Sequence, residues 1–290
     1  MSKLNAIALT PIAFATLLLL QSPIAYAQDA AKMKPSAVSA TAMTQQLDQI
    51  GAGYYKADQP GATVIVMKDG KTMLRKAYGL ANLSNKEALQ ADHVMRLGSI
   101  TKQFTAVAIL QLVEDGKIAL NDPVTKFFPD YPETGKTVTI EHLLTHTSGI
   151  PSYTGKPGFV AKSVKDISVS EMVDSFKNDA LEFEPGTSYK YNNSGYFLLG
   201  AIIEKVSGET YANYVAKRIY TPLGMNNTAH EGHERSQQAR AQGYSQRGEG
   251  FDPSMKISMT QPYAAGSLTS TVDDLAKWDA AITAGKLLKA

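Results

Sequence analysis

The pattern of hydrophobic and polar residues changes along the chain, and its first part predicts a helix followed by a β-hairpin. Residues 43–55 carry apolar side chains at helical spacing, which indicates a helix. Two runs rich in apolar residues, 62–67 and 72–78, then flank a tight polar turn. Asp-Gly is a preferred pair for a two-residue hairpin turn, so Asp69 and Gly70 predict the turn of this hairpin.

From residue 100 onward the pattern is helical. Residues 100–114 are apolar almost all round, which predicts a buried helix that ends near Gly116. Further segments with a helical pattern are 139–144, capped by Thr139, together with 170–176, 195–206, 211–220 and 271–282. The sequence therefore predicts one strand pair near the start and many helices after it, without an internal repeat or a long linker.

The first 27 residues have the features of a signal peptide. Lys3 provides a basic start, residues 6–20 form an uncharged and mostly apolar run, and Ala-Tyr-Ala at 25–27 fits the small-x-small cleavage pattern. The alternative is a membrane anchor, which needs about 20 apolar residues, whereas this run is shorter and contains Pro11. We therefore expect an exported bacterial protein, periplasmic or secreted, that begins with a leader at 28–40 and keeps no stable membrane anchor after cleavage.

Composition narrows the class of protein without identifying a function. The chain has 290 residues, 43% of them hydrophobic, with 29 Lys and Arg against 27 Asp and Glu. The hydrophobic content excludes a disordered chain, and the net charge of +2 lacks the basic excess of a nucleic-acid-binding protein. The absence of cysteine excludes disulfide scaffolds, thiol nucleophiles and cysteine-based zinc sites.

A serine and a lysine at the start of the predicted buried helix are the first candidates for chemistry. In Gly98-Ser99-Ile100-Thr101-Lys102, the spacing of three places Ser99 and Lys102 on one face, one turn apart. A serine hydroxyl needs a neighbouring base to act as a nucleophile, and lysine is a base only where burial or the helix dipole lowers its pKa. The alternative is that Ser99 caps the helix. Ser-x-x-Lys alone is weak, because it is expected about once by chance in such a chain.

A second candidate is the loop at 185–195, which precedes an apolar helix. It presents Tyr191 and Asn193 two residues apart. A phenol beside a lysine can shuttle the serine proton, and an amide can hold a substrate carbonyl. The alternative is a tyrosine-rich packing loop. Tyr211 and Asn213 have the same spacing but lie in a helical pattern, so we interpret them as packing residues.

The segment around Ser99 resembles a known family. Residues 96–105, Arg-Leu-Gly-Ser-Ile-Thr-Lys-Gln-Phe-Thr, are similar to the nucleophile segment of the serine beta-lactamase-related proteins. This group of class C beta-lactamases, DD-peptidases and esterases belongs to the penicillin-binding-protein-like superfamily. The resemblance spans roughly residues 43–283. Its other matching segments, in the expected order, are Pro60-Gly61-Ala62, residues 143–150, residues 222–225, and residues 265–271 followed by Asp274-Leu275.

The resemblance implies a fold and a role for each candidate residue. The fold class is α+β and beta-lactamase/transpeptidase-like, with an antiparallel sheet flanked by helices and a mainly helical region. Ser99 would be the acylated nucleophile and Lys102 its partner, while Tyr191 would be the proton shuttle and Asn193 a polar substrate contact. The backbone N–H of Ser99 would supply half of the oxyanion hole. Whether Lys102 or Tyr191 is the base stays open at the level of the family.

The sequence departs from the family in one motif. The family has Lys or His, a small residue and Gly on a later strand that lines the site and supplies the second oxyanion donor. No Lys/His-Ser/Thr-Gly triplet occurs here, since Lys68-Asp69-Gly70 is the hairpin turn and His230-Glu231-Gly232 comes too early. The family's remaining sheet strands follow the position of Ala290, so we expect the C-terminal strands to be missing. The expected domain is residues 41–290, incomplete at its C-terminus, with 41–94 in the α/β lobe and 95–290 in the mainly helical lobe.

Histidines outside the motifs have less specific interpretations. The segment from His230 to Glu234 lacks the i, i+4 histidine spacing of zinc hydrolases, so it predicts a solvated loop rather than a metal site. His146 is expected to form structural hydrogen bonds. We expect neither a metal nor a cofactor.

The sequence as a whole predicts an exported serine hydrolase that acts on amide or ester bonds through an acyl-enzyme on Ser99. The expected partner is a small-molecule or peptide substrate: a beta-lactam, a D-amino acid peptide or a small ester. The alternative is a truncated, catalytically weak or inactive homologue that at most binds cell-wall peptide or beta-lactam. The sequence feature that separates the two hypotheses is the missing Lys/His-Ser/Thr-Gly motif.

Overall fold

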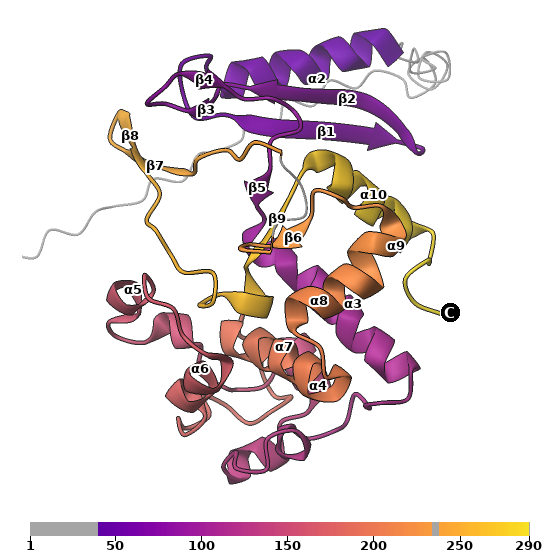
Figure 1. Cartoon of the computed structure of the whole chain (residues 1–290), viewed down its shortest axis with the longest axis vertical. Helices are drawn as coiled ribbons and strands as arrows, with labels where there is room; N and C mark the ends of the chain where they lie inside the picture. The colour runs from indigo at the N-terminus through magenta and orange to yellow at the C-terminus, as the bar shows by residue number, and fades with distance from the viewer. Residues whose placement is uncertain (1–39, 234–237, 290) are drawn as a thin grey trace, which may run out of the picture. The chain divides into compact units, whose positions relative to one another are not determined.

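The computed structural model describes residues 40–233 and 238–289 (Figure 1). The predicted signal peptide at 1–27 and all of the predicted leader except residue 40 lie outside these residues. The described residues from 43 onward form one compact unit, and helix α2 (Ala40–Tyr54) begins three residues before residue 43. Within the described residues, no helix combines the length and the apolar character needed to cross a membrane.

The predicted hairpin is confirmed. Strands β1 (Ala62–Lys68) and β2 (Lys71–Tyr78) pair antiparallel and are joined by a two-residue turn. Asp69 and Gly70 in this turn both have a positive φ, 51° and 73°. Positive φ at both central residues is the type I′ geometry, whose twist matches that of the two strands.

Gly61 lies in Pro60-Gly61-Ala62, one of the segments that resemble the family, at the start of β1. A Cβ at this position would lie 1.7 Å from the backbone oxygen of Tyr78, where the open end of the hairpin brings two backbones together. Only glycine permits such a close approach. Within Pro60-Gly61-Ala62, the glycine is therefore a packing requirement of the hairpin.

The predicted helices are present, with ends that differ by a few residues. They are α2, predicted at 43–55, α3 (Thr101–Glu114), α4 (Ile140–Leu144), α6 (Val169–Phe176), α7 (Asn193–Ser207), α8 (Tyr211–Val215) and α10 (Val272–Thr283). The segment predicted at 211–220 continues after α8 as a π-helix, Ala216–Tyr220. The short helices α5 (Phe159–Lys162) and α9 (Thr221–Leu223) lie outside the predicted ranges. Thr139 caps α4 as predicted, because its side chain accepts the His142 N–H.

The expectation of a single strand pair is wrong, because the structure contains further small antiparallel sheets. Strands β3 (Leu80–Asn82) and β4 (Glu87–Ala88) pair with each other, as do β7 (Tyr244–Arg247) and β8 (Gly250–Pro253). A three-stranded sheet has the order β5-β9-β6, built from β5 (Met95–Arg96), β9 (Leu268–Ser270) and β6 (Ala229–His230). Strands of two to four residues are too short for an alternating pattern to be recognised.

The pairing of β5 with β9 positions the segment that contains Ser99. The Leu97 N–H donates to the Leu268 carbonyl at 2.8 Å. The Thr101 hydroxyl, at the start of α3, accepts the Leu268 N–H at 3.1 Å. Backbone and side-chain bonds therefore hold the turn at Ser99 against the matching segment 265–271.

Helices α3 and α7 supply much of the hydrophobic core of this unit. Their fully buried apolar residues include Phe104, Ile109 and Leu112 on α3 and Phe197 on α7, which confirms the predicted burial of α3. The Phe104 ring stacks on Trp278 of α10 with centroids 4.0 Å apart. The helix that begins just after Ser99 is thus in direct contact with α10 through this pair of rings.

Truncating Phe104 tests the importance of this packing. The Phe104→Ala variant is expected to lower the free energy of unfolding by about 3–5 kcal/mol, because it removes a fully buried ring and leaves a cavity. Urea unfolding followed by circular dichroism measures the change. Ile282→Ala is the control, since Ile282 on α10 is 48% exposed and its truncation is expected to cost less than about 0.5 kcal/mol. Equal losses in the two variants would contradict the assignment of the core.

Candidate active site

Ser99 lies at the turn where β5 leads into α3. Gly98 has a φ of 53°, and Gly98–Ile100 form a 3-10 turn that continues into α3. The N-cap positions of the turn and of α3 are Leu97 and Ile100, and neither makes a side-chain cap bond. The alternative role of Ser99 as a helix cap is therefore wrong. Its side chain is exposed and has other partners.

The Lys102 ammonium group lies beside Ser99 in a buried position. Its Nζ donates to Ser99 Oγ at 3.2 Å, to Asn193 Oδ1 at 2.9 Å and to the Ala265 carbonyl at 2.8 Å. Lys102 is only 6% exposed, and desolvation by this burial lowers its pKa to about 8. A neutral amine is therefore accessible near neutral pH, which is the condition for a base at this position.

Tyr191 and Asn193 reach the same point from the start of α7. The Tyr191 hydroxyl donates to Ser99 Oγ at 2.6 Å, while the residue as a whole is 45% exposed. Asn193 Oδ1 accepts from Lys102, and Asn193 Nδ2 donates to Thr154 Oγ1 at 3.1 Å. The structure thus brings together all four residues that the sequence indicated.

Some of the groups that hold this cluster have no signature in the sequence. The Ala265 carbonyl fixes Lys102 through a backbone atom, which no residue type reveals. Ser152 Oγ accepts the Asn193 N–H at 3.3 Å, and Thr154 binds the same residue. Ala265 belongs to a segment that matches the family, whereas Ser152 and Thr154 follow such a segment without a recognisable pattern of their own.

Asn192 anchors the loop that carries Tyr191. It is buried and caps α7, because its Oδ1 accepts the Gly195 N–H at 2.7 Å and its Nδ2 donates to the Ile150 carbonyl. Asparagine directly before an apolar helix is a known capping signal, so this role can be read from the sequence. The predicted structural hydrogen bonding of His146 is confirmed, since its Nδ1 accepts the Asn192 N–H at 3.1 Å.

The histidine pair near β6 has a different environment from the predicted solvated loop. His230 lies in β6 and packs against the rings of Tyr211 and Tyr263, so the loop prediction is wrong at this position. Burial lowers the pKa of His230. The Glu231 carboxylate accepts hydrogen bonds from Arg96 Nε at 2.7 Å and from Arg96 Nη2 at 2.8 Å. No cluster of three or more metal-ligating side chains was found in the described residues, and Glu234 lies outside them.

The second Tyr-x-Asn sequence is a packing element, as predicted. Tyr211 begins α8 and is fully buried. Its hydroxyl lies 2.8 Å from Thr105 Oγ1, which itself donates to the Ala264 carbonyl at 2.7 Å. The Tyr211 side chain therefore joins α8 to α3 within the core.

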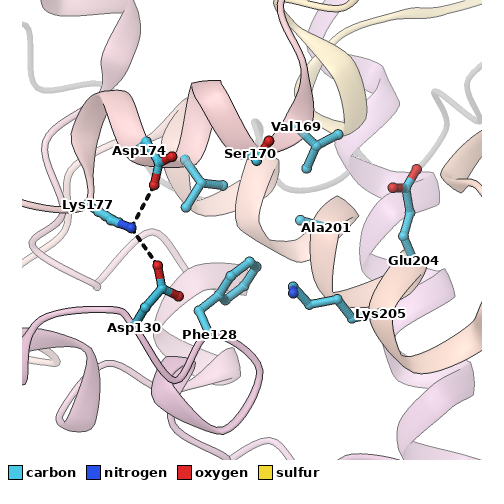
Figure 2. Close-up of a pocket in the computed structure, with 10 residues that line it drawn as sticks. Phe128, Asp130, Val169, Ser170, Asp174, Lys177, Ala201, Glu204 and Lys205 are labelled. Atoms are coloured by element: carbon cyan, nitrogen blue, oxygen red, sulfur yellow. Dashed lines mark hydrogen bonds and ion pairs between the residues drawn. The ribbon is translucent and has the colours of Figure 1, made fainter.

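A cavity of about 460 Å³ lies apart from Ser99, along α6 and α7 (Figure 2). Its size is within the usual range of ligand pockets. Phe128 and Ala201 contribute apolar walls, and at its edge Lys177 lies 2.6 Å from both Asp130 and Asp174. None of the four candidate residues lines this cavity. The chemistry of the candidate site therefore belongs to the cluster around Ser99.

Comparison with known proteins places the chain in a family. The family profile described as Beta-lactamase matches residues 27–290. The chain belongs to the beta-lactamase family. Among its curated relatives, penicillin-binding protein 4* of Bacillus subtilis (strain 168) is 38% identical over 174 residues, which are 59% of this chain and 38% of that protein.

Solved structures confirm the predicted beta-lactamase/transpeptidase-like α+β fold. The octameric penicillin-binding protein homologue from Pyrococcus abyssi superposes with a TM-score of 0.70 at 34% identity, covering 83% of this chain and 56% of that one. The D-amino acid amidase from Ochrobactrum anthropi SV3, complexed with D-phenylalanine, superposes with a TM-score of 0.70 at 30% identity, covering 86% and 72%. This beta-lactamase-family chain spans less than half the length of penicillin-binding protein 4* and about half of the Pyrococcus protein.

Proposed function

We propose that this beta-lactamase-family chain is a serine hydrolase that cleaves amide or ester bonds through an acyl-enzyme on Ser99. The observation that carries the proposal is the pair of hydrogen bonds that Ser99 Oγ receives, one from Lys102 and one from Tyr191. Lys102 is buried, and its pKa is lowered to about 8. A nucleophile and a group able to take its proton thus lie within one turn of helix.

The proposed reaction has an acylation and a deacylation step. Ser99 Oγ attacks the substrate carbonyl carbon, and its proton passes to Lys102 Nζ, either directly or through the Tyr191 oxygen. The C–N or C–O bond then breaks, and the departing amine or alcohol takes up that proton. Water attacks the resulting ester by the same route, which releases the acid and restores the Ser99 hydroxyl.

Asn193 is proposed to hold Lys102 and to contact the substrate. Its Oδ1 accepts a hydrogen bond from the Lys102 ammonium group, which orients the lysine toward Ser99. The amide nitrogen carries two protons, and the bond to Thr154 uses one of them. The second N–H of this amide is proposed to donate a hydrogen bond to an oxygen of the bound substrate.

D-amino acid amides and peptides, beta-lactams and small esters are the proposed substrates. The similarity to a D-amino acid amidase supports an amide bond next to a D-configured residue. The similarity to penicillin-binding proteins supports reaction with a beta-lactam ring. Export is part of the proposal, because residues 1–27 have the composition of a cleavable signal peptide.

A second candidate function is a homologue that is acylated slowly or only binds its ligand. Residues 1–290 contain no Lys/His-Ser/Thr-Gly triplet, and a chain without this motif would also be without the second oxyanion donor that the family resemblance implies. Loss of one such donor costs about 10²–10³ in turnover. This second candidate would form a persistent adduct with a beta-lactam, or bind cell-wall peptide without cleaving it.

Covalent labelling followed by mass spectrometry tests the proposal. The purified protein is treated with a fluorescent fluorophosphonate and a fluorescent penicillin, and the modified peptide is identified after digestion. We expect one adduct per chain, on Ser99. An acyl group that is lost after excess penicillin is removed supports the hydrolase. A persistent acyl group, together with no turnover of a D-amino acid amide or a small ester, supports the second candidate. The nucleophile assignment is overturned if a folded sample stays unmodified or carries the label on another residue.

A further inference from the structure

His146 follows α4 and lies in a conformation that a non-glycine residue adopts rarely. Its φ is 61°, in the left-handed region. The imidazole ring packs among tyrosine rings, with centroids 4.7 Å from Tyr191 and 5.1 Å from Tyr196, and it meets Tyr189 edge-on at 6.0 Å. This residue therefore contacts the side chain that donates to Ser99.

His146 also binds the backbone on both sides of Tyr191. Its carbonyl accepts the Lys190 N–H at 2.9 Å, and its Nδ1 accepts the Asn192 N–H at 3.1 Å. An imidazole that accepts at Nδ1 and is neutral carries its proton on Nε2. His146 therefore holds Tyr191 through hydrogen bonds to the residues on either side of it and through a ring contact with Tyr191 itself.

We propose that His146 is a positioning residue, whose neutral imidazole holds the Tyr191 hydroxyl on Ser99 by accepting the Asn192 N–H and packing against the Tyr191 ring. This inference rests on the proposed function, because it concerns the proton transfer from Ser99. Tyr191 is 45% exposed, so only part of its side chain is held by neighbouring groups. Lys102 Nζ lies 4.7 Å from the centroid of its ring, and the His146 ring packs against it at the same centroid distance.

The charges around His146 favour its neutral form. Lys102 faces it from α3, the tyrosines face it from the loop and α7, and the neighbouring Lys190 is paired with Glu182 at 2.6 Å. Burial and the Lys102 charge lower the pKa of His146 below 6.5. Protonation would place an N–H at Nδ1, opposite the Asn192 N–H, and would remove the acceptor. The restraint on Tyr191 is therefore expected to fail at acidic pH.

Two substitutions separate the hydrogen bond from the ring contact. His146→Asn keeps an acceptor near the Nδ1 position and tolerates a positive φ, but it cannot titrate. His146→Phe keeps a ring and removes the acceptor. We expect His146→Phe to be labelled by fluorophosphonate about 10- to 100-fold more slowly than the wild type, as for a small misplacement of a reacting group. His146→Asn keeps the acceptor but loses the ring contact, so we expect its rate to fall between those of His146→Phe and the wild type.

The pH profile of labelling gives a readout that a purely structural role would not change. If Lys102 must be neutral, the wild-type labelling rate falls about tenfold per pH unit below the Lys102 pKa. Below the His146 pKa, protonation of His146 should steepen the fall to about 100-fold per pH unit. We expect the steeper limb in the wild type and not in His146→Asn. His142→Asn is the matched control, because His142 also accepts through Nδ1, from the Thr139 N–H of α4, and it should leave the profile unchanged.

Nitrogen NMR of the histidine side chains tests the same inference without relying on activity. We expect His146 in its Nε2–H form, with a pKa below 6.5. A protonated Nδ1 at neutral pH would overturn the proposal, as would wild-type labelling kinetics and pH profile in a folded His146→Phe variant. If the wild type is not labelled at Ser99, the proposed function fails, while the NMR result still decides whether His146 holds the Asn192 N–H.

Discussion

Replacing Ser99 with alanine is expected to abolish labelling at this position and to reduce hydrolysis by about 10⁶-fold, the order of loss when a serine hydrolase loses its nucleophile. Alanine removes the oxygen to which Lys102 and Tyr191 both donate. No ester with the substrate can then form. Initial rates with a chromogenic ester and a D-amino acid anilide measure the loss, and fluorophosphonate labelling of the same samples measures nucleophile reactivity directly.

The matched control for this variant is Ser170→Ala. Ser170 lines the separate cavity (Figure 2) and makes no bond to the cluster around Ser99, so wild-type rates are expected. Because the Ser99 side chain is exposed and makes no cap bond, Ser99→Ala should also unfold at the wild-type temperature. Undiminished hydrolysis by a folded Ser99→Ala protein would place the nucleophile on another residue.

The elements that the sequence predicts correctly are those whose signal is local. Helix α3 is apolar almost all round, and the β1–β2 turn is specified by the pair Asp69-Gly70, whose two positive φ values suit it. The β5-β9-β6 sheet has no local signal, because β9 (Leu268–Ser270) is buried on every residue and does not alternate. Two of its three residues are polar, and the Thr269 hydroxyl donates a hydrogen bond to the Ala229 carbonyl on the neighbouring strand. Such strands become recognisable only from their partners.

The same distinction applies to the candidate site. Ser99 and Lys102 lie one helical turn apart, so their proximity follows from spacing alone. Tyr191 comes from a segment about 90 residues later, and the sequence connects it to Ser99 only through the family resemblance. Lys102 is buried because the Ala265 segment and α7 pack around it in the folded chain. The lowered pKa is therefore a property of the tertiary structure, which the residue types suggest but do not determine.

Replacing Lys102 with methionine is expected to slow acylation of Ser99 by about 10²–10⁴-fold, the usual contribution of a positioned base. Burial lowers the Lys102 pKa to about 8 in the folded protein, so the wild-type rate should rise with pH as the neutral amine forms and level off above about pH 8. The methionine variant should lack this rise. Between about pH 8 and the ordinary lysine pKa the folded state binds fewer protons than the unfolded state, so Lys102 should make the wild type more stable as pH increases there.

Comparison with Lys102→Arg and Tyr191→Phe decides which residue is the base. Arginine keeps the charge and donors that face Asn193 and Ala265, but it does not lose its proton in proteins. If Lys102 is the base, the arginine and methionine variants should be equally slow. If Tyr191 is the base and Lys102 supplies only positive charge, arginine should retain more activity than methionine, and Tyr191→Phe should be the slowest. A folded methionine variant with the wild-type rate and pH profile would remove Lys102 from the mechanism altogether.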